Sequence, residues 1–353
     1  MEDEKYTSHV ESGAANGGPS APPQKVSFWT KRKNHYKRFW WLHLLILIIV
    51  VLVVTLPLVY VGFPNIAQSQ LNKSTLNITM QQITNPTPTS VQLAQMAIAG
   101  NPSSYHPNLD GFQAALFLED TEPNIQPFGY IEIPPLHATR YTGITTNQTL
   151  NITNMDQFTA YNNLGLTTKT YRVALRGRTK LHEMKFPTTT VDFNQVVTLN
   201  GLNNFDGINV TNFQLFLTPQ GPDQANLIGE ILIPNPTIQA IEFGNVTFNV
   251  SVDGQNIGQS FLNNLMLMPG NHTYPLRSTT DQEAVIGLIT SKYKDGILPL
   301  TLIGESVVYN GQHLPYFEGP LRNSTQHLNL NVGPALAQLG LNLGSLSGSN
   351  STG

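Results

Sequence analysis

A single apolar run near the N-terminus constrains the layout of this chain more than any other feature. Residues 39–61 contain no Asp, Glu, Lys or Arg. As a helix with about 1.5 Å of rise per residue, the run is about 35 Å long and can cross a hydrocarbon core of about 30 Å. Its late start and its length argue against a cleaved signal peptide, whose apolar core has about 7–15 residues. We therefore expect one uncleaved transmembrane signal anchor at residues 39–61.

Basic residues on the two sides of this run predict its orientation. Five of them come just before it, whereas Lys73 is the only Lys or Arg in the forty residues that follow. The five are Lys31, Arg32, Lys33, Lys37 and Arg38. The positive-inside rule places the N-terminus in the cytosol and the C-terminal part in a lumen or outside the cell, as in a single-pass type II protein. Residues 1–38, with many small residues and prolines, are expected to form a disordered cytosolic tail.

All N-glycosylation sequons lie after the apolar run. There are ten, against roughly five that the Asn, Ser and Thr content of this region predicts by chance. Their asparagines are Asn72, Asn77, Asn147, Asn151, Asn209, Asn245, Asn249, Asn271, Asn323 and Asn350. This excess supports a glycosylated luminal face.

The region after the anchor is acidic, and the chain contains no cysteine. The 12 Lys and Arg against 18 Asp and Glu give this region a net charge of −6, which disfavours nucleic-acid binding. The absence of Cys excludes cysteine catalysis, thiolate zinc sites and iron–sulfur clusters. An extracytoplasmic region of this size can bury an ordinary core without disulfides.

Alternating polar and apolar residues predict β-strands. From Asn245 to Val252 the even positions are apolar and the odd positions are polar, so Asn245 and Asn249 should face solvent together. Asp253-Gly254 and Asp295-Gly296 supply turns between such segments. The expected fold is mainly β: two tandem antiparallel β-sandwiches, each with a short helix, on a single N-terminal transmembrane helix.

A weak internal repeat supports two similar units. Asn85-Pro86-Thr87 recurs as Asn235-Pro236-Thr237, at an offset of 150 residues. Three later features recur at offsets of 129, 124 and 127 residues: a glycine-containing strand at Gly129 and Gly258, a sequon at Asn147 and Asn271, and a strand at residues 173–177 and 300–304. A short helix is expected in each copy, at residues 154–163 and 281–293. The offsets indicate a duplicated unit of about 130 residues, with an insertion near residues 101–110 of the first copy. The expected parts are a first luminal sandwich at 64–200, a second at 201–334 and a flexible tail at 335–353.

The second unit resembles a known sandwich family. Residues 244–250, Gly254, Ile257-Gly258 and residues 267–270 follow an Asn-Pro turn and resemble the late-embryogenesis-abundant group-two sandwich, also called the water-stress domain. With a basic cytosolic tail, one anchor and a cysteine-free ectodomain, the chain resembles an uncharacterised fungal single-pass membrane family built on that sandwich. Residues 165–304 carry the better match. The resemblance implies a vacuolar or other endomembrane location, favoured over the plasma membrane, and no catalytic residues.

The sequence contains no familiar catalytic or cofactor motif. It has no Gly-x-Ser-x-Gly elbow, no His-Glu-x-x-His, no phosphate-binding loop and no dinucleotide fingerprint. The nine histidines form no pair at ligand spacing, so we expect no metal and no cofactor. Glu119, Asp120 and Glu122 form the densest acidic group, for which a solvated loop is favoured over calcium coordination or glycosidase chemistry.

One predicted strand carries a basic stripe. Arg172, Arg176, Arg178 and Lys180 are separated by even numbers of residues, so they share one face of the strand. An exposed sheet face or a protected sheet edge explains such a stripe structurally. Its functional interpretation is a docking site for an acidic partner or a lipid headgroup.

Three classes of function remain open. The favoured one is a membrane-anchored, glycosylated luminal interaction module without catalytic activity, which binds a protein partner at an endomembrane or vacuolar membrane. The alternative is a lipid-binding or lipid-transfer sandwich with an apolar cleft between its sheets. An enzyme acting on glycans is the least favoured class, because the expected catalytic constellations are missing.

Overall fold

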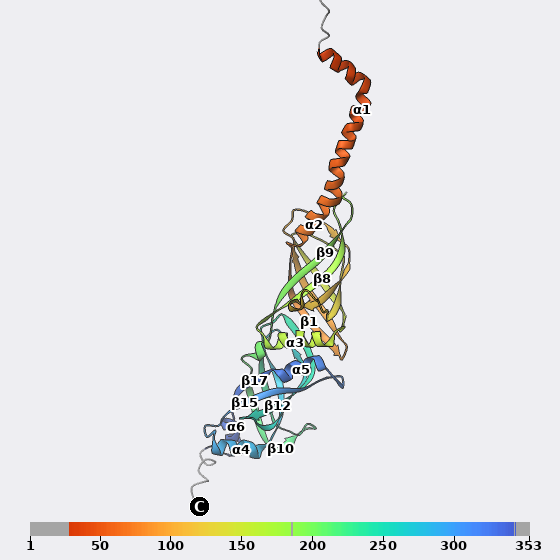
Figure 1. Ribbon diagram of the computed structural model, residues 1–353. Helices are drawn as coiled ribbons and strands as arrows, with labels where there is room; N and C mark the ends of the chain where they lie inside the picture. Colours follow the sequence, from red (N-terminus) through yellow and green to blue (C-terminus); the bar gives the residue numbers. More distant parts are fainter. Residues whose placement is uncertain (1–27, 185, 342, 344–353) are drawn as a thin grey trace, which may run out of the picture. The chain divides into compact units, whose positions relative to one another are not determined.

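The computed structural model describes residues 28–184, 186–341 and 343 (Figure 1). The chain divides into two compact units, one ending at Leu58 and the other beginning at Val59. Residues 1–27 of the predicted tail and the sequon at Asn350 lie outside the described residues. The second unit is mainly β-sheet with short helices, as the sequence predicted.

The N-terminal part is helical and includes a segment that can span a membrane. α1 (Phe28–Pro57) is followed by a π-helical turn, η1 (Leu58–Gly62). From Phe39 onward this segment is long and apolar enough to cross a bilayer, which is consistent with a signal anchor. Residues 28–38 are helical, which differs from the disorder expected for them. The sequence has no Gly or Pro between residues 24 and 56, so no helix breaker separates these residues from the apolar run, and a kink at Phe39 marks the junction.

The second unit contains two halves with similar element order. The first half comprises α2 (Phe63–Leu71), β1 (Thr75–Thr87), β2 (Ser90–Gly100), β3 (Asn108–Leu109), β4 (Phe112–Leu118), η2 (Glu119–Thr121), β5 (Gly129–Ile133), β6 (Leu136–His137), β7 (Tyr141–Asn151), α3 (Met155–Thr167), β8 (Thr170–His182) and β9 (Thr189–Asn200). The second half comprises η3 (Asn203–Phe205), β10 (Asn209–Gln220), β11 (Ala225–Asn235), β12 (Gln239–Val252), β13 (Gln255–Leu267), β14 (Gly270–Thr280), α4 (Gln282–Ser291), β15 (Ile297–Tyr309), β16 (Gln312–His313), α5 (Pro315–Asn323), β17 (Thr325–Asn331) and α6 (Gly333–Gln338). The predicted limit between residues 200 and 201 falls directly after β9, and both halves lie in one compact unit.

The described strands form two hydrogen-bonded sheets. The larger sheet has the order β10-β11-β14-β13-β12-β1-β2-β7, with β15 on β12 and with β16 and β17 on β15. The smaller sheet has the order β5-β4-β8-β3-β6, with β9 on β8. Among the described strands every pairing is antiparallel except that of β1 with β12, which is parallel.

The two halves share their strand connections, which supports a duplication. In the first half the neighbouring strands are β1-β2-β7 and β5-β4-β8-β9, and α3 lies between β7 and β8 in the chain. In the second half they are β10-β11-β14 and β13-β12-β15-β17, and α4 lies between β14 and β15. The predicted sequon pair, Asn147 and Asn271, therefore occupies equivalent strands. The Asn-Pro-Thr pair does not, because Asn85 lies near the end of β1 whereas Asn235 ends β11, and these two strands are not equivalent.

Burial in β12 follows the predicted alternation. Val246, Phe248 and Val250 are buried, and Asn245 is exposed. Asn249 is half-buried rather than fully exposed, because its Oδ1 accepts a hydrogen bond from Gln259 Nε2 on β13 at 3.2 Å. Alternation along the strand thus predicts the face of each side chain, whereas the neighbouring strand sets its final exposure.

Part of the predicted C-terminal tail forms a helix. Residues 335–338 were expected to belong to a flexible tail, but they form part of α6. Ala335 and Leu336 of this helix are buried, so the ordered chain extends further than the Gly, Ser and Asn content of the segment indicated. Residues 344–353 lie outside the described residues.

A buried amide side chain joins the two halves. β1 and β12 pair over three residues each, beginning with Gln81 opposite Gln239. Gln239 Nε2 lies 2.7 Å from Gln81 Oε1, 2.9 Å from the Tyr171 hydroxyl and 3.3 Å from the Tyr161 hydroxyl. All four residues are buried, and burial raises the pKa of both tyrosines. The network supplies partners to polar groups that would otherwise be buried without any.

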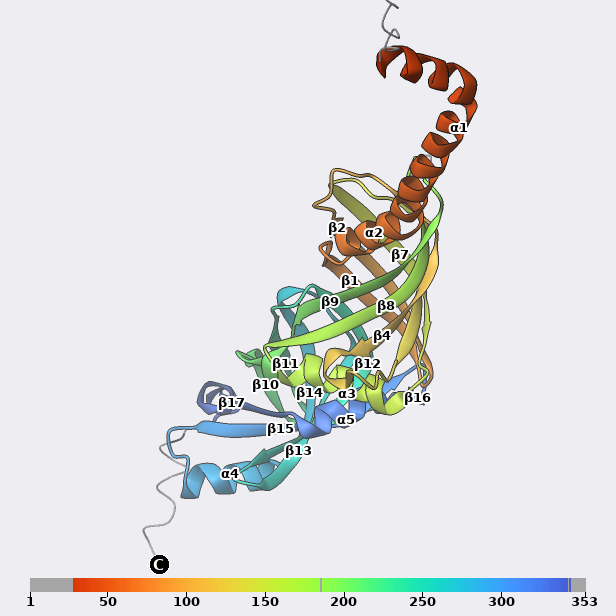
Figure 2. The same cartoon turned by 45° about the horizontal axis from the view of Figure 1, so that its top comes forward.

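Aromatic side chains from α3 and α5 complete this junction. Figure 2 shows α3 and α5 side by side, below the strands of the first half. The ring of Tyr316 on α5 lies 5.0 Å from that of Phe158 on α3 and 4.7 Å from that of Phe317. The Tyr316 hydroxyl donates to the carbonyl oxygen of Thr87, at the end of β1, at 2.7 Å. The second half therefore packs against both the sheet and the helix of the first.

Replacing Gln239 with Leu should destabilise the second unit. The variant leaves Gln81, Tyr161 and Tyr171 without a shared buried donor, and one unsatisfied buried polar group costs about 1–3 kcal/mol. Gln82→Leu is the matched control, because Gln82 is the next residue of β1 and is only half-buried. Denaturant unfolding followed by circular dichroism should show a loss for Gln239→Leu and a change within about 0.5 kcal/mol for the control. Equal stability of the two variants would contradict the role of the network.

Candidate functional site

Strand β8 carries the basic residues identified in the sequence on one face. Arg172, Arg178 and Lys180 are exposed and Arg176 is half-buried, whereas Val173, Leu175 and Thr179 on the opposite face of the strand are buried. His182 continues the row by two residues and is partly exposed. The even spacing along the strand produces this common face.

The first two arginines pair with the acidic group that follows β4. Arg172 Nη1 lies 2.7 Å from Glu119 Oε2, and Arg176 Nη2 lies 2.5 Å from Glu122 Oε1. The guanidinium of Arg176 also lies 5.5 Å from the centre of the Phe117 ring. The predicted basic stripe and the predicted acidic group therefore face each other. Neither is an isolated patch of one charge.

The remainder of the row pairs with carboxylates from two other segments. Arg178 Nε donates to Asp192 Oδ1 on β9 at 2.7 Å, and this hydrogen bond raises the pKa of Arg178. His182 Nε2 lies 3.0 Å from Asp110 Oδ1. Lys180 makes no ion pair with any described residue. We call this set the β8 ladder: Arg172, Arg176, Arg178, Lys180 and His182, with Glu119, Glu122, Asp192 and Asp110.

The end of the ladder contains a chain of hydrogen bonds that the sequence did not reveal. The Thr188 hydroxyl lies 3.1 Å from His182 Nδ1, and His182 Nε2 contacts Asp110. A hydroxyl, an imidazole and a carboxylate in series are the components of a nucleophilic site. Thr188 and Asp110 are exposed, however, and none of the three residues lines the cavities described below. Asp110 is 72 residues before His182, so no local spacing could have predicted the contact.

The described residues contain no group suited to hold a metal ion. Within residues 28–184, 186–341 and 343, no three His, Asp or Glu side chains gather in a metal-binding arrangement. Asp120 is exposed and forms no ion pair with a described residue, while its neighbours Glu119 and Glu122 are paired with arginines. Two of the three residues in the acidic group, Glu119 and Glu122, thus belong to the β8 ladder.

The sequons and the β8 ladder occupy different sheets. Of the nine sequon asparagines within the described residues, eight are exposed and Asn249 is half-buried. Their occupancy stays a prediction. The sequence has no sequon at residues 78–146 or 152–208, and these ranges contain every strand of the smaller sheet. The smaller sheet therefore carries no glycan attachment site.

The second half encloses an apolar cavity of about 60 Å³. Its lining is aliphatic except for Ser260, Ser278 and Thr280, and the first two hydroxyls lie 2.7 Å apart. Leu215 of β10 and Leu330 of β17 both line it, although these two strands do not pair with each other among the described strands. In the second half the larger sheet therefore curls so that β10 and β17 border the same cavity. We call the boundary between these two unpaired strands the seam. Smaller cavities of about 20 and 30 Å³ lie beside the Gln239 network and inside the first half.

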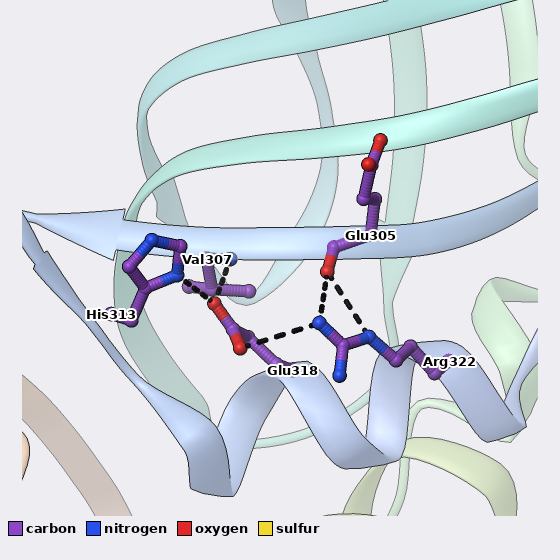
Figure 3. Close-up of polar contacts among 5 residues, drawn as sticks. All are labelled: Glu305, Val307, His313, Glu318 and Arg322. Carbon is purple, nitrogen blue, oxygen red and sulfur yellow. Dashed lines mark hydrogen bonds and ion pairs between the residues drawn. The ribbon is translucent and has the colours of Figure 1, made fainter.

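A buried carboxylate connects α5 to β15 (Figure 3). Glu318 Oε1 accepts hydrogen bonds from the Val307 backbone N–H at 3.1 Å and from His313 Nδ1 at 2.6 Å. Arg322 lies 3.5 Å from the other carboxylate oxygen and donates twice to the carbonyl oxygen of Glu305, at 3.1 and 2.7 Å. These contacts satisfy backbone groups where the pairing of β15 becomes irregular. The cluster therefore holds α5 in place, and no sequence motif identified it.

The loop between β10 and β11 is held by a second ion pair of low exposure. Asp223 accepts from Arg277 Nε at 2.5 Å and from Arg277 Nη2 at 2.7 Å. Arg277 Nη2 also donates to the carbonyl oxygen of Gln220 at 2.7 Å. The hydrogen bonds from Arg277 lower the pKa of Asp223 below its ordinary value of 3.8.

Comparisons with known proteins add a family of unknown function and distant structural likenesses. Residues 126–250, a little over a third of the chain, match the model of a family described as a protein of unknown function, DUF3712. No curated protein matches the sequence. Among solved structures, red sea bream transglutaminase is similar at 9% identity over 72% of this chain and 31% of that chain, with a TM-score of 0.23. A Mobiluncus mulieris adhesin is similar at 9% identity over 66% of this chain and 81% of that chain, with a TM-score of 0.19. The E. coli chaperone DraB is similar at 10% identity over 73% and 98%, with a TM-score of 0.18.

Glu318 should tolerate Gln but not Leu. Gln keeps an oxygen that can accept from the Val307 N–H, whereas Leu leaves that buried donor and Arg322 without their partner. We expect Glu318→Leu to lower the free energy of unfolding by about 1–3 kcal/mol more than Glu318→Gln. Thermal unfolding of the two variants side by side measures this difference. If both lose stability equally, the hydrogen bond to Val307 is not the stabilising contact.

The Asp223–Arg277 pair should stabilise the fold only above acidic pH. Because the folded-state pKa of Asp223 is depressed, its contribution is complete above the unfolded value near 3.8 and is lost as pH falls through the folded value. Asp223→Asn should therefore be less stable than the unmodified chain at pH 6, and the difference should shrink below about pH 4. Asp120→Asn is the control, because it removes an exposed carboxylate without an ion pair to a described residue, and it should be about as stable as the unmodified chain at pH 6. A difference that is constant from pH 6 to pH 2 would contradict the assignment.

Proposed function

We propose that this protein is a membrane-anchored, glycosylated luminal interaction module without catalytic activity, which binds a protein partner through the β8 ladder. In this proposal α1 anchors the chain with a cytosolic N-terminus in a vacuolar or other endomembrane. The two halves correspond to the tandem sandwiches of the late-embryogenesis-abundant group-two type, as in the fungal single-pass family that the sequence resembles. The observation that carries the proposal is that the ladder lies on the sheet without a glycan attachment site.

The exposure and charge pattern of the ladder suit a polar protein interface. Every paired side chain in it is more than a quarter exposed, so these pairs contribute little to folding stability. The basic side chains on one face of β8, most of them paired with a carboxylate from a neighbouring segment, can exchange partners with a complementary surface. Such patterns favour one register and exclude surfaces with like charges at the same positions. Lys180 adds a positive charge that no described carboxylate neutralises.

A variant with swapped charges tests the affinity for the partner separately from the stability of the fold. Arg178→Asp combined with Asp192→Arg preserves the ion pair but reverses the charges at two ladder positions. Because both side chains are exposed, the swapped protein should melt close to the unmodified chain and lose affinity for the partner. The partner is first captured in intact membranes with a photo-crosslinking residue at position 180. A crosslinker at Tyr141, on the sheet that carries sequons, is the matched control.

The outcomes of this experiment are distinct. One discrete crosslinked product from position 180, absent from position 141 and lost in the swapped protein, would support the proposal. Crosslinks that persist unchanged in the swapped protein would show that the ladder is only a solvated surface.

A second candidate function is the binding of an apolar ligand such as a lipid. The aliphatic cavity, its three hydroxyls and the seam between β10 and β17 favour it. At about 60 Å³ the cavity has room for about four water molecules, so a lipid chain requires the seam to open. Ser278→Leu fills the polar end of the cavity and should abolish binding of a fluorescent fatty acid, whereas the ladder swap should leave it unchanged. Equal binding by all three proteins would exclude this cavity as the site.

A further inference from the structure

The helix that follows the apolar run is firmly attached to the first half. Gln68 on α2 donates from Nε2 to the carbonyl oxygen of Asp192 and accepts from the Asp192 N–H, both at 2.8 Å. An amide side chain thus takes the place of a neighbouring strand on β9. Ala67 packs with Leu181 and Val191 in a small apolar cluster beneath this contact. α2 and the ends of β8 and β9 therefore behave as one rigid piece.

Covalent continuity limits how far this piece can lie from the bilayer. Phe63 follows the end of the apolar run at Val61 by two residues. Two residues cover at most about 7 Å when extended and about 3 Å when helical. The headgroup region on each side of the hydrocarbon core is about 5–7 Å thick. If residues 39–61 span the bilayer, Phe63 must lie in or next to this headgroup region.

Exposed apolar side chains between β8 and β9 lie beside Phe63. The ring of Phe186 stacks on that of Phe63, with centres 4.6 Å apart and planes 9° apart. Phe186 remains 42% exposed and Met184 is 80% exposed. Ile66 on α2 is 49% exposed. Met184 has φ of 44°, a backbone conformation that is uncommon for Met, so the turn presents this side chain to solvent at a conformational cost.

We infer that Met184, Phe186 and Ile66 form a membrane-contact patch. The patch enters the headgroup region of the leaflet that holds the C-terminal end of residues 39–61. The occupant of this patch is the bilayer that holds the anchor, because the chain tethers Phe63 to it and Phe63 contacts Phe186. Apolar side chains such as Phe and Leu insert about 5–10 Å into the boundary between headgroups and acyl chains in segments that lie on a membrane. The patch adds a second attachment beside the single helix and fixes the orientation of the first half on the membrane. This inference depends on the anchor and is independent of any partner of the β8 ladder.

Single cysteines offer a direct test, because the chain contains none of its own. The full-length protein is reconstituted in phospholipid nanodiscs with a spin label at Met184→Cys, at Ile66→Cys or, as the control, at Leu217→Cys. Leu217 lies on β10 in the second half and is 66% exposed. Accessibility of each label to oxygen, which concentrates in lipid, is compared with accessibility to a water-soluble nickel chelate. We expect the oxygen-to-nickel ratio at positions 184 and 66 to exceed that at 217 by at least about threefold, because the headgroup region excludes the polar reagent.

The alternatives give different results. Ratios at positions 184 and 66 equal to that at 217 would overturn the inference, because both labels would then lie in water. Low accessibility to both reagents would also overturn it and would indicate that protein, not lipid, covers the patch. Two independent positions keep the test valid if one substitution disturbs the turn.

Discussion

The parallel contact between β1 and β12 is the constraint on which the second compact unit depends. It covers three residues of each strand, yet it places the two halves in one sheet. This short contact is reinforced by the hydrogen bonds of Gln239 to Gln81 and to two tyrosine hydroxyls, and by the packing of α3 on α5. A pair of duplicated units could have remained separate domains on a linker. Here the buried amide network joins the two halves. The β8 ladder and the cavity therefore belong to one compact unit.

The two halves share strand connections but differ in how they close, and this difference separates their candidate functions. In the second half β13 pairs with β14, so one continuous sheet curls around an aliphatic interior. In the first half the equivalent strands, β5 and β7, lie close together without pairing, and two separate sheets result. The curled sheet leaves a cavity and a seam, which suit an apolar ligand. The separate smaller sheet has an outer face without sequons, which suits a protein partner.

Local patterns predicted local structure well. Alternation identified the buried face of β12, and the expected short helices appear with Asn154 and Asp281 as N-caps, whose side chains accept backbone hydrogen bonds. What the sequence could not show were contacts between distant residues. In the sequence, Arg178 and Asp192 each look like an ordinary exposed residue. The pairing of β8 with β9 places them opposite each other, and contacts of this kind turn the predicted basic stripe into a set of ion pairs. The Asn-Pro-Thr repeat predicted a wrong correspondence between strands of the two halves. A common turn motif carries no information about which strand precedes it.

The separation between the joined strands also has a consequence for synthesis. Gln81 and Gln239 are 158 residues apart, so the edge of β1 that β12 will cover is complete long before its partner exists. At about 5–20 residues per second, the ribosome needs roughly 8–30 s to make the intervening chain. During that interval the nascent first half exposes an unpaired strand edge and the aromatic face of α3. Unpaired edges of this kind attract other chains. The first half therefore needs protection from such pairing until the second half has been made.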